Sequence, residues 1–350
     1  MRTIPLSGRP LPHRAVALAL ALTLAAGVLI EAPRPASSQS PKRRIVFAMP
    51  VAPPNVVHTP VALAKELGFM DKVNLDLDIK NFEGSTRGLT AAIAGGVDVG
   101  YINCEEAYGN GVPLVGFYDT AARLPVVLLA RDSIKTVQDL KGKKLNLSSA
   151  PGGFVDRMNR AALATAGLKP DDVTMVPSTT AGRVPSLLTG AADAAIFHYE
   201  QASKVLRSVR GFHVLLDMYQ ALPQYDYHLM CGMRQWVQQH RGAVVDMVAA
   251  TILALRYAYT HRTETVRALV GITGAEEPDA GYAYAKLTTS CVWSRNTGID
   301  MKRLNWYVDY VYGFGDIKTK YRAEEMVDLS IAADALKKAG GPIPVPSGCL

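Results

Sequence analysis

The sequence has few of the residues that build metal centres or nucleophilic active sites. Only four of its 350 residues are cysteines, and no two of them form a C-x-x-C pair. It also has no H-x-H, H-E-x-x-H or acidic calcium loop, so we expect no metal site. Because no G-x-S-x-G or other nucleophile signature stands out, we expect neither catalytic residues nor a cofactor.

Basic runs are almost absent, although the formal net charge is +7. The first 38 residues hold four arginines and one glutamate, so the rest of the chain carries only +4. The one basic cluster, Lys42-Arg43-Arg44, lies close to this boundary. A chain with so little clustered positive charge is not expected to bind nucleic acid.

Long apolar runs are confined to the N-terminus. Residues 15–30 carry no charge, three arginines precede them, and small residues lie just before Gln39. This pattern predicts a signal peptide over residues 1–38, cleaved near Ser38, and hence a secreted protein, periplasmic in a cell with two membranes. The apolar run is short for a membrane-spanning helix, and no second candidate follows.

Four cysteines in an oxidising compartment can form disulfides. They allow three complete pairings, among which the sequence does not choose. We expect Cys104 and Cys231 to be small buried residues near strand ends; the other two are Cys291 and Cys349.

Residues 144–168 predict a strand, a Ser-Ser-Ala-Pro-Gly-Gly turn and a helix with Gly167 after its end. Such a turn directs backbone N–H groups and the hydroxyls of Ser148 and Ser149 to the positive end of a helix, which suits a small ligand. The alternative is an ordinary strand–helix turn. Asp156 in the first helical turn favours this alternative, because its carboxylate already complements the helix dipole.

A weak internal repeat flanks this stretch. Residues 84–102 and 181–197 each predict a helix, a glycine stop, an aspartate and a strand of small residues, aligned at Asp98 and Asp193. One such unit in each half of the chain suggests two similar α/β lobes. Residues 119–125 and 219–227 are the predicted crossings between the lobes.

The C-terminal part predicts helices over residues 243–262, 264–270, 278–289, 300–312 and 324–339. Aromatic residues recur at helical spacing in the fourth of these. We expect this stripe to be core; it comprises Trp306, Tyr307, Tyr310 and Tyr312.

Four motifs occur in order along the chain: PVALAKELGF at 60–69, AAIAGGVDVG at 91–100, VQDLKGKK at 137–144 and LLTGAADAA at 187–195. Over residues 44–330 the chain resembles the periplasmic solute-binding proteins of ABC importers, in the group that includes nitrate, sulfonate, taurine and thiamine-pyrimidine binders. The resemblance implies an α/β, type II two-lobe fold with a hinge and a helical C-terminal part. The lobes would comprise residues 39–122 plus 224–350, and residues 123–223. It further implies a monomer that passes a small solute to an ABC permease and ATPase at the inner membrane.

In such a fold the solute lies beyond the carboxyl ends of the strands, between the lobes. The expected ligand-binding residues of the first lobe are Asn55, His58, Glu83, Ser85, Thr86, Asn103 and Glu105. Those of the second lobe are Ser149, Gly152, Gly153, Phe154, Thr179, Thr180, His198 and Tyr199. His58, His198 and His228 could meet at the cleft, but their wide separation in the sequence does not indicate a metal site.

The expected rim is acidic, since it includes Glu83, Glu105, Glu106 and Glu200 and no lysine. It therefore favours a neutral or basic small organic molecule, such as a nitrogen heterocycle. Arg87 or Arg183 pointing inward would favour the alternative, a sulfonate or nitrate anion. A second alternative is an enzyme similar to the pyrimidine-synthesising proteins, but their CCCGC motif is absent. A third is a sensor partner that docks on a membrane receptor.

Overall fold

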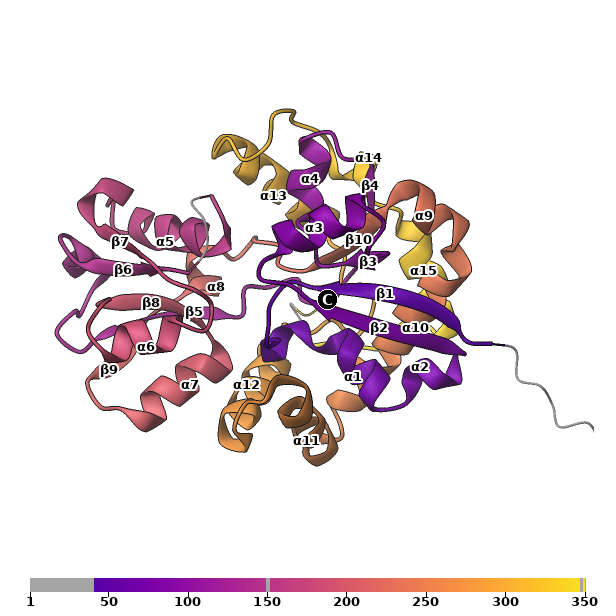
Figure 1. Cartoon of the computed structure of the whole chain (residues 1–350), viewed down its shortest axis with the longest axis horizontal. Coiled ribbons are helices and arrows are strands. Elements are labelled where there is room, and N and C mark those ends of the chain that lie inside the picture. The colour runs from indigo at the N-terminus through magenta and orange to yellow at the C-terminus, as the bar shows by residue number, and fades with distance from the viewer. Residues whose placement is uncertain (1–40, 149–151, 347–348, 350) are drawn as a thin grey trace, which may run out of the picture. The chain divides into compact units, whose positions relative to one another are not determined.

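Two five-stranded mixed sheets organise the chain (Figure 1). The computed structural model describes residues 41–148, 152–346 and 349, so the predicted signal peptide and Ser149 lie outside the described residues. The first sheet has the order β2-β1-β3-β10-β4. Its strands are β1 (Arg43–Met49), β2 (Leu75–Asn81), β3 (Val99–Gly100), β4 (Leu114–Asp119) and β10 (Leu229–Met233).

The second sheet repeats this arrangement with the order β7-β6-β8-β5-β9. Its strands are β5 (Val126–Arg131), β6 (Lys144–Leu147), β7 (Thr174–Pro177), β8 (Ala194–His198) and β9 (Phe212–Asp217). In each sheet the fourth strand, β10 or β5, is antiparallel to both of its neighbours. The predicted α/β class with two lobes is confirmed. We call the part built on the first sheet the first lobe and residues 126–221 the second lobe; the exact boundaries given above remain predictions.

The two aspartates of the sequence repeat have the same structural role. The Asp98 carboxylate accepts a hydrogen bond from the Val46 N–H at 2.7 Å, which ties β3 to β1. The Asp193 carboxylate accepts one from the Lys144 N–H at 3.0 Å, which ties β8 to β6. Each aspartate thereby fixes the parallel strand pair whose carboxyl ends face the other lobe.

The helices of the second lobe are α5 (Phe154–Ala164), α6 (Arg183–Leu188), α7 (Tyr199–Ser208) and α8 (Met218–Ala221), with short 3-10 turns η2 (Val137–Leu140) and η3 (Pro170–Asp172). The first lobe begins with η1 (Val56–His58), α1 (Pro60–Glu66), α2 (Phe69–Lys72), α3 (Ser85–Ile93) and α4 (Cys104–Gly109). Its C-terminal helices are α9 (Arg234–Gln239), α10 (Arg241–Ala258), α11 (Arg262–Thr273), α12 (Glu277–Thr289), α13 (Met301–Gly313), α14 (Ala323–Met326) and α15 (Leu329–Lys338).

Helix α10 is the apolar centre of the first lobe. It buries most of its length and packs with β1, β2 and α15 in one cluster of buried residues. In Figure 1 it lies behind β1 and β2. A helix that is apolar on nearly all sides has to be covered on nearly all sides, which explains why the C-terminal helices return to the first sheet.

The last predicted helix, 324–339, is wrong as a single element. It is divided between α14 and α15, because Val327 forms a bridge to Gly116 of β4 and Asp328 starts a new helix. The Asp328 side chain accepts a hydrogen bond from the Ser330 N–H at 3.0 Å, as an N-cap does. The predicted aromatic core is right for buried Tyr307 but wrong for Tyr312, which is 45% exposed.

Cys104 and Cys231 are buried, as expected, and form a disulfide with each other across α4 and β10. Cys291 and Cys349 form a second disulfide. The sequence could not select this pairing, because it depends on which residues the fold brings within reach.

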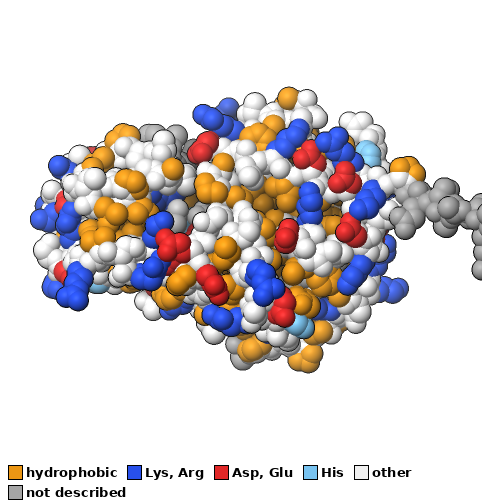
Figure 2. Space-filling view, turned by 60° about the horizontal axis from the view of Figure 1, so that its bottom comes forward, with side chains coloured by type: hydrophobic (Ala, Val, Ile, Leu, Met, Phe, Trp, Pro, Cys, Tyr) orange, Lys and Arg blue, Asp and Glu red, His pale blue; other side chains and the backbone are white. Residues whose placement is uncertain are grey.

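Charged side chains of both signs are interspersed on the face of the molecule shown in Figure 2, whereas apolar side chains gather over the second lobe at the left. The more exposed large apolar residues of this lobe are Leu188, Leu206, Val209 and Val214. Within the described part of the chain, no helix has the length and hydrophobicity needed to cross a membrane.

Candidate functional site

The carboxyl ends of β1, β3, β6 and β8 point towards the region between the lobes, and buried aromatic and imidazole rings gather there. We call His58, Tyr101, His198, Tyr227 and His228 the ring cluster. His58 ends η1, Tyr101 follows β3 and His198 ends β8. Tyr227 and His228 lie in the return connection just before β10. Both lobes and the connection between them therefore contribute to the cluster.

The rings of this cluster are in direct contact. The His228 ring stacks on Tyr101 with a centroid distance of 4.3 Å and on Tyr227 with one of 4.1 Å. The His58 ring lies 4.3 Å from His228 and 5.4 Å from His198. Phe154 adds an apolar edge, with its ring 5.3 Å from Tyr227. Flat rings in this arrangement suit a flat guest.

The three histidines of the cluster are neutral. Burial lowers the pKa of His58 to about 3, and the charge of Arg183 contributes in the same direction. Burial also lowers the pKa of His198 and of His228 well below the usual value. A neutral imidazole offers one donor and one acceptor, so these rings can hydrogen-bond to a molecule that carries both kinds of group.

In each histidine, one ring nitrogen has no hydrogen bond of good geometry to the described part of the chain. The Nε2 atoms of His198 and His58 lie 2.6 Å and 3.5 Å from the Tyr227 hydroxyl oxygen. In contrast, the Nδ1 atoms of His58, His198 and His228 are buried without a hydrogen-bond partner among the described residues. Each buried polar atom left unpaired costs about 1–3 kcal/mol. Three of them in one cluster indicate a polar ligand there.

A hydrogen bond between the lobes borders the cluster. The Asn55 side-chain N–H donates to the Glu200 carboxylate at 2.7 Å. Burial raises the pKa of Glu200. The guanidinium of Arg183 is buried close by, donates to the Ser148 hydroxyl at 2.8 Å, and interacts electrostatically with Glu200. Arg183 therefore does point inward, but a carboxylate compensates its charge.

Three acidic residues are buried near the two connections between the lobes. Burial raises the pKa of Glu105 to about 8, with a contribution from the neighbouring Glu106 charge, and that of Asp119 to about 6. Burial and the nearby Asp119 raise the pKa of Asp226 well above its usual value. Asp119 accepts a hydrogen bond from the Ala121 N–H at 2.8 Å, whereas both carboxyl oxygens of Asp226 are buried without a hydrogen-bond partner among the described residues. This region favours hydrogen-bond donors and disfavours anions.

The structure brings Asn55, His58, Phe154 and His198 together, and it buries Glu105 near the connections. Ser85 and Asn103 are half-buried and form a hydrogen bond with each other. Gly153 and Thr180 are also half-buried. The remaining predicted residues are exposed: Glu83, Thr86, Gly152 and Thr179. Ligand contact by all of these residues stays a prediction.

Two of the predicted contributors have other partners. Tyr199 is buried in the apolar cluster that includes Leu187, Val205 and residues of α12, so the structure does not bring its ring to the ring cluster. The Gly152 N–H donates to the Asp156 carboxylate at 2.7 Å. The Asp156 carboxylate therefore already occupies this donor, as the ordinary-turn alternative expects; ligand contact by Gly152 stays a prediction.

Sequence reasoning missed Tyr101 and Tyr227 as members of the cluster. Only their positions in the sequence could have indicated them: Tyr101 is the second-last residue of the first repeat unit, and Tyr227 is the last residue of the predicted return crossing.

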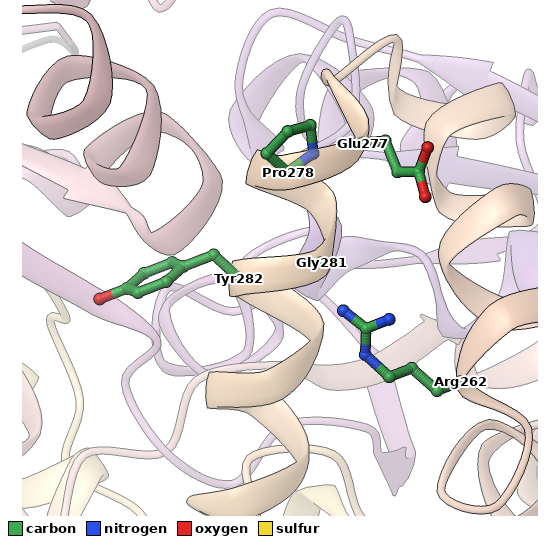
Figure 3. Close-up of a pocket in the computed structure, with 5 residues that line it drawn as sticks. All are labelled: Arg262, Glu277, Pro278, Gly281 and Tyr282. Atoms are coloured by element: carbon green, nitrogen blue, oxygen red, sulfur yellow. The ribbon is translucent and has the colours of Figure 1, made fainter.

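A surface hollow between α11 and α12 is lined by Arg262, Glu277, Pro278, Gly281 and Tyr282 (Figure 3). None of these five side chains holds a buried unpaired polar atom, so the hollow lacks the feature that marks the ring cluster. Among the described residues, no group of three or more histidine, cysteine, aspartate or glutamate side chains is arranged to hold a metal ion.

The family described as NMT1/THI5 like matches residues 55–265, more than half of the chain. The chain belongs to this family. A Haemophilus influenzae protein named for thiamine biosynthesis is 28% identical over 224 residues, which are 62% of this chain and 69% of that protein. A Brucella abortus protein named as a binding protein is 30% identical over 158 residues, which are 43% of this chain and 47% of that protein.

Solved structures share the fold. The nitrate-binding protein NrtA from Synechocystis has a TM-score of 0.68 at 14% identity, over 85% of this chain and 89% of its own. The aliphatic sulphonate binding protein SsuA from Escherichia coli has a TM-score of 0.65 at 20% identity, over 82% and 97%. The desulfurization enzyme DszB has a TM-score of 0.62 at 14% identity, over 85% and 99%. The predicted resemblance is thus confirmed for family and fold; at these identities the structures carry no information on the ligand.

Proposed function

We propose that this NMT1/THI5-like chain is a periplasmic solute-binding protein that closes its two lobes on a small, flat nitrogen heterocycle. The observation that carries the proposal is the ring cluster, where three buried neutral histidines each have an unpaired Nδ1 atom. The cluster supports a guest that stacks between rings and both donates and accepts hydrogen bonds.

The charges around the cluster support a neutral or basic guest. Arg183 is the buried cation beside it, and Glu200 lies within its electrostatic reach. Near the connections, Glu105, Asp119 and Asp226 supply three buried carboxyl groups, and Arg303 is a cation that interacts with the last two. These carboxylates would repel a sulfonate or nitrate, so the anion alternative has less support.

Binding would shift an equilibrium between open and closed lobes. His58 and His198 come from different lobes, so a guest touches both only in the closed form. A ligand with contacts unique to one state shifts the population towards that state. Delivery to an ABC permease and ATPase, secretion by means of residues 1–38, and a monomeric state belong to the same proposal.

The DszB likeness and the thiamine-biosynthesis relative make an enzyme the second candidate. Thiol catalysis has no support, because Cys104, Cys231, Cys291 and Cys349 are all paired in disulfides.

The test begins with the purified mature protein. Native mass spectrometry reports any solute carried through purification, and thermal shift compares pyrimidines and other nitrogen heterocycles, amines, alkanesulfonates and nitrate. A heterocycle at about 100 times its Kd should stabilise the protein by about 2.7 kcal/mol. A response to sulfonates or nitrate alone, or turnover of any compound, would contradict the proposal.

A matched pair of variants locates the site. His228→Phe keeps a stacked ring but removes the unpaired nitrogen, and it should weaken the heterocycle. His240 provides the control, because its ring stacks on Trp236 at the same 4.3 Å and 16° that relate His228 and Tyr101. His240→Phe should leave affinity unchanged. Equal affinities for both variants would remove the ring cluster as the site.

A further inference from the structure

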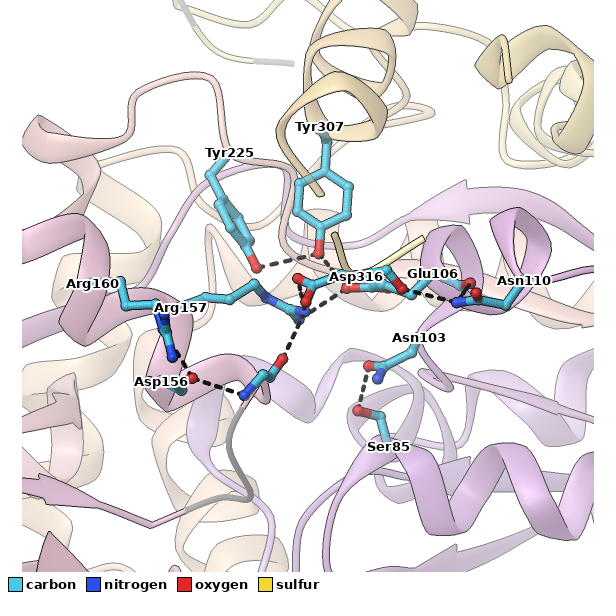
Figure 4. A network of polar contacts seen from close by, with 11 residues as sticks. Ser85, Asn103, Glu106, Asn110, Asp156, Arg157, Arg160, Tyr225, Tyr307 and Asp316 are labelled. Carbon is cyan, nitrogen blue, oxygen red and sulfur yellow. Dashed lines mark hydrogen bonds and ion pairs between the residues drawn. The ribbon is translucent and has the colours of Figure 1, made fainter. Parts of the chain in front are cut away.

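Arg157 of α5 reaches out of the second lobe into a carboxylate pair of the first lobe (Figure 4). One terminal guanidinium nitrogen lies 2.9 Å from the Glu106 carboxylate of α4, and the other lies 3.2 Å from the Asp316 carboxylate that follows α13. The Arg157 side chain is 6% exposed. The contact is therefore a buried ionic link between the lobes.

Further hydrogen bonds complete this link. The Tyr307 hydroxyl donates to the same Glu106 oxygen at 2.7 Å, and the Tyr225 and Tyr307 hydroxyl oxygens are 3.3 Å apart. Arg157 also donates to the Gly152 carbonyl of its own lobe at 3.1 Å. Since Tyr225 lies in the return connection and Tyr307 in α13, three parts of the chain meet around one guanidinium group.

We propose that Arg157 is a closure residue: it holds the two lobes together through Glu106 and Asp316 and so positions the halves of the ring cluster without being a member of it. This inference rests on the two-lobe closure of the proposed function. When the lobes separate, water can hydrate Arg157 and both carboxylates. If the lobes close without Arg157, the Glu106 carboxylate is buried with no cationic partner. Burying an unpaired charge costs far more free energy than removing a charge at the surface.

A second arginine provides an internal comparison. Arg207 of α7 also reaches from the second lobe to two carboxylates of the first, Glu276 at 2.6 Å and Asp279 at 3.0 Å. Its side chain, however, is 42% exposed. The Glu276 carboxylate is exposed too, so water screens that pair. Asp279 is buried, but it keeps a hydrogen bond from the Ser203 hydroxyl at 2.7 Å when the arginine is removed. We therefore expect closure to depend on Arg157 and only weakly on Arg207.

Arg160 provides the matched control. It lies on the same helix three residues after Arg157, and it pairs at 3.0 Å with Asp156 of that helix. Arg160→Gln and Arg157→Gln remove the same charge from α5, but only the second breaks a link between the lobes.

The decisive experiment is small-angle X-ray scattering of the full mature protein without added solute, together with hydrogen exchange of α4 and α5. Arg157→Gln should increase the radius of gyration and the exchange at the facing ends of these helices, whereas Arg160→Gln and Arg207→Gln should match the wild type. Arg157→Lys should restore the wild-type scattering in part. A folded Arg157→Gln protein with the wild-type profile would overturn the inference.

If Arg157→Gln does not fold, Asp316→Asn replaces it, because this change keeps the arginine and weakens the link from the less buried side. It should expand the protein; an unchanged profile would overturn the inference in this arm too. A heterocycle from the thermal-shift panel gives an independent readout, with about tenfold weaker binding to Arg157→Gln if the closed fraction falls tenfold. The scattering arm needs no ligand, so a failed ligand screen and a failed closure test are distinct results.

Discussion

The two lobes share a backbone plan and differ in the side chains that they present to each other. Both sheets have the same strand order, with one antiparallel strand in the fourth place, and both use an aspartate to tie the parallel strands. In the ion pairs between the lobes, the second lobe contributes the arginines and the first lobe contributes the carboxylates. The repeat thus produces two lobes of similar backbone structure, and the opposite charges on their facing surfaces make them complementary.

The comparison also has a steric side. Gly100 of β3 and Ala195 of β8 occupy equivalent places after Asp98 and Asp193. A Cβ atom on Gly100 would lie 2.5 Å from the Ala48 carbonyl oxygen of the neighbouring strand. The second sheet accommodates a methyl group at the same place. The first sheet is therefore packed more closely around β3.

The largest effect that we predict follows from this difference. Gly100→Ala should destabilise the protein by about 3 kcal/mol, because the methyl group meets backbone atoms that can move only with the strand. The reciprocal Ala195→Gly should cost only about 1 kcal/mol, mainly in chain entropy. Urea denaturation of both variants measures the two values. Equal costs would mean that the two strands are packed alike.

An intermediate effect is predicted for the paired aspartates. Asp98→Ala and Asp193→Ala each leave a strand N–H without its acceptor, and each should cost about 2 kcal/mol. Chemical denaturation checks this. If one variant is strongly destabilised and the other is not, the two aspartates do not have equivalent structural roles, although they align in the sequence.

The smallest effect concerns the pH dependence of stability. It involves the buried acidic residues near the connections, which lie in the first lobe and the return connection. The pKa of Glu105 is raised in the folded protein to about 8, so the folded state holds a proton that the unfolded state has lost. Stability should therefore fall as the pH rises, by about 1 kcal/mol per pH unit from this group between about pH 6.5 and about pH 8. The three buried histidines of the ring cluster act in the opposite direction up to about pH 7.5, because their unfolded forms still bind protons there. This contribution is the same in the wild type and in Glu105→Gln, so it cancels when their slopes are compared.

Glu105→Gln should flatten this decline, as measured by urea denaturation across the same pH range. Glu264→Gln, an exposed change on α11, is the control and should retain the wild-type slope. An unchanged slope in Glu105→Gln would show that Glu105 is ionised in the folded protein.

Much of the scaffold could be predicted from the sequence, because local patterns determine it. The glycine stops, the small-residue strands and the aligned aspartates predict two similar α/β units, and both aspartates have equivalent hydrogen bonds. The break at Val327 was not predictable, since it results from a bridge to a strand about two hundred residues earlier. The same holds for the Cys104–Cys231 pair, which are 127 residues apart.

The candidate site was predictable in outline. Position at the end of a strand identified Asn55, His58 and His198 correctly as neighbours in space. It failed to place the Tyr199 ring, because Tyr199 starts α7 and turns into the apolar cluster with α12. The stacking of Tyr101 and Tyr227 on His228 depends on how the return connection packs, which no local pattern encodes.

The most direct test of the account is a crystal structure of the protein with the heterocycle that native mass spectrometry or thermal shift selects. The account predicts electron density between the lobes, stacked beside His228 and hydrogen-bonded to at least one of the three unpaired Nδ1 atoms. Density in the hollow between α11 and α12, or a ring cluster that the bound molecule does not touch, would contradict it.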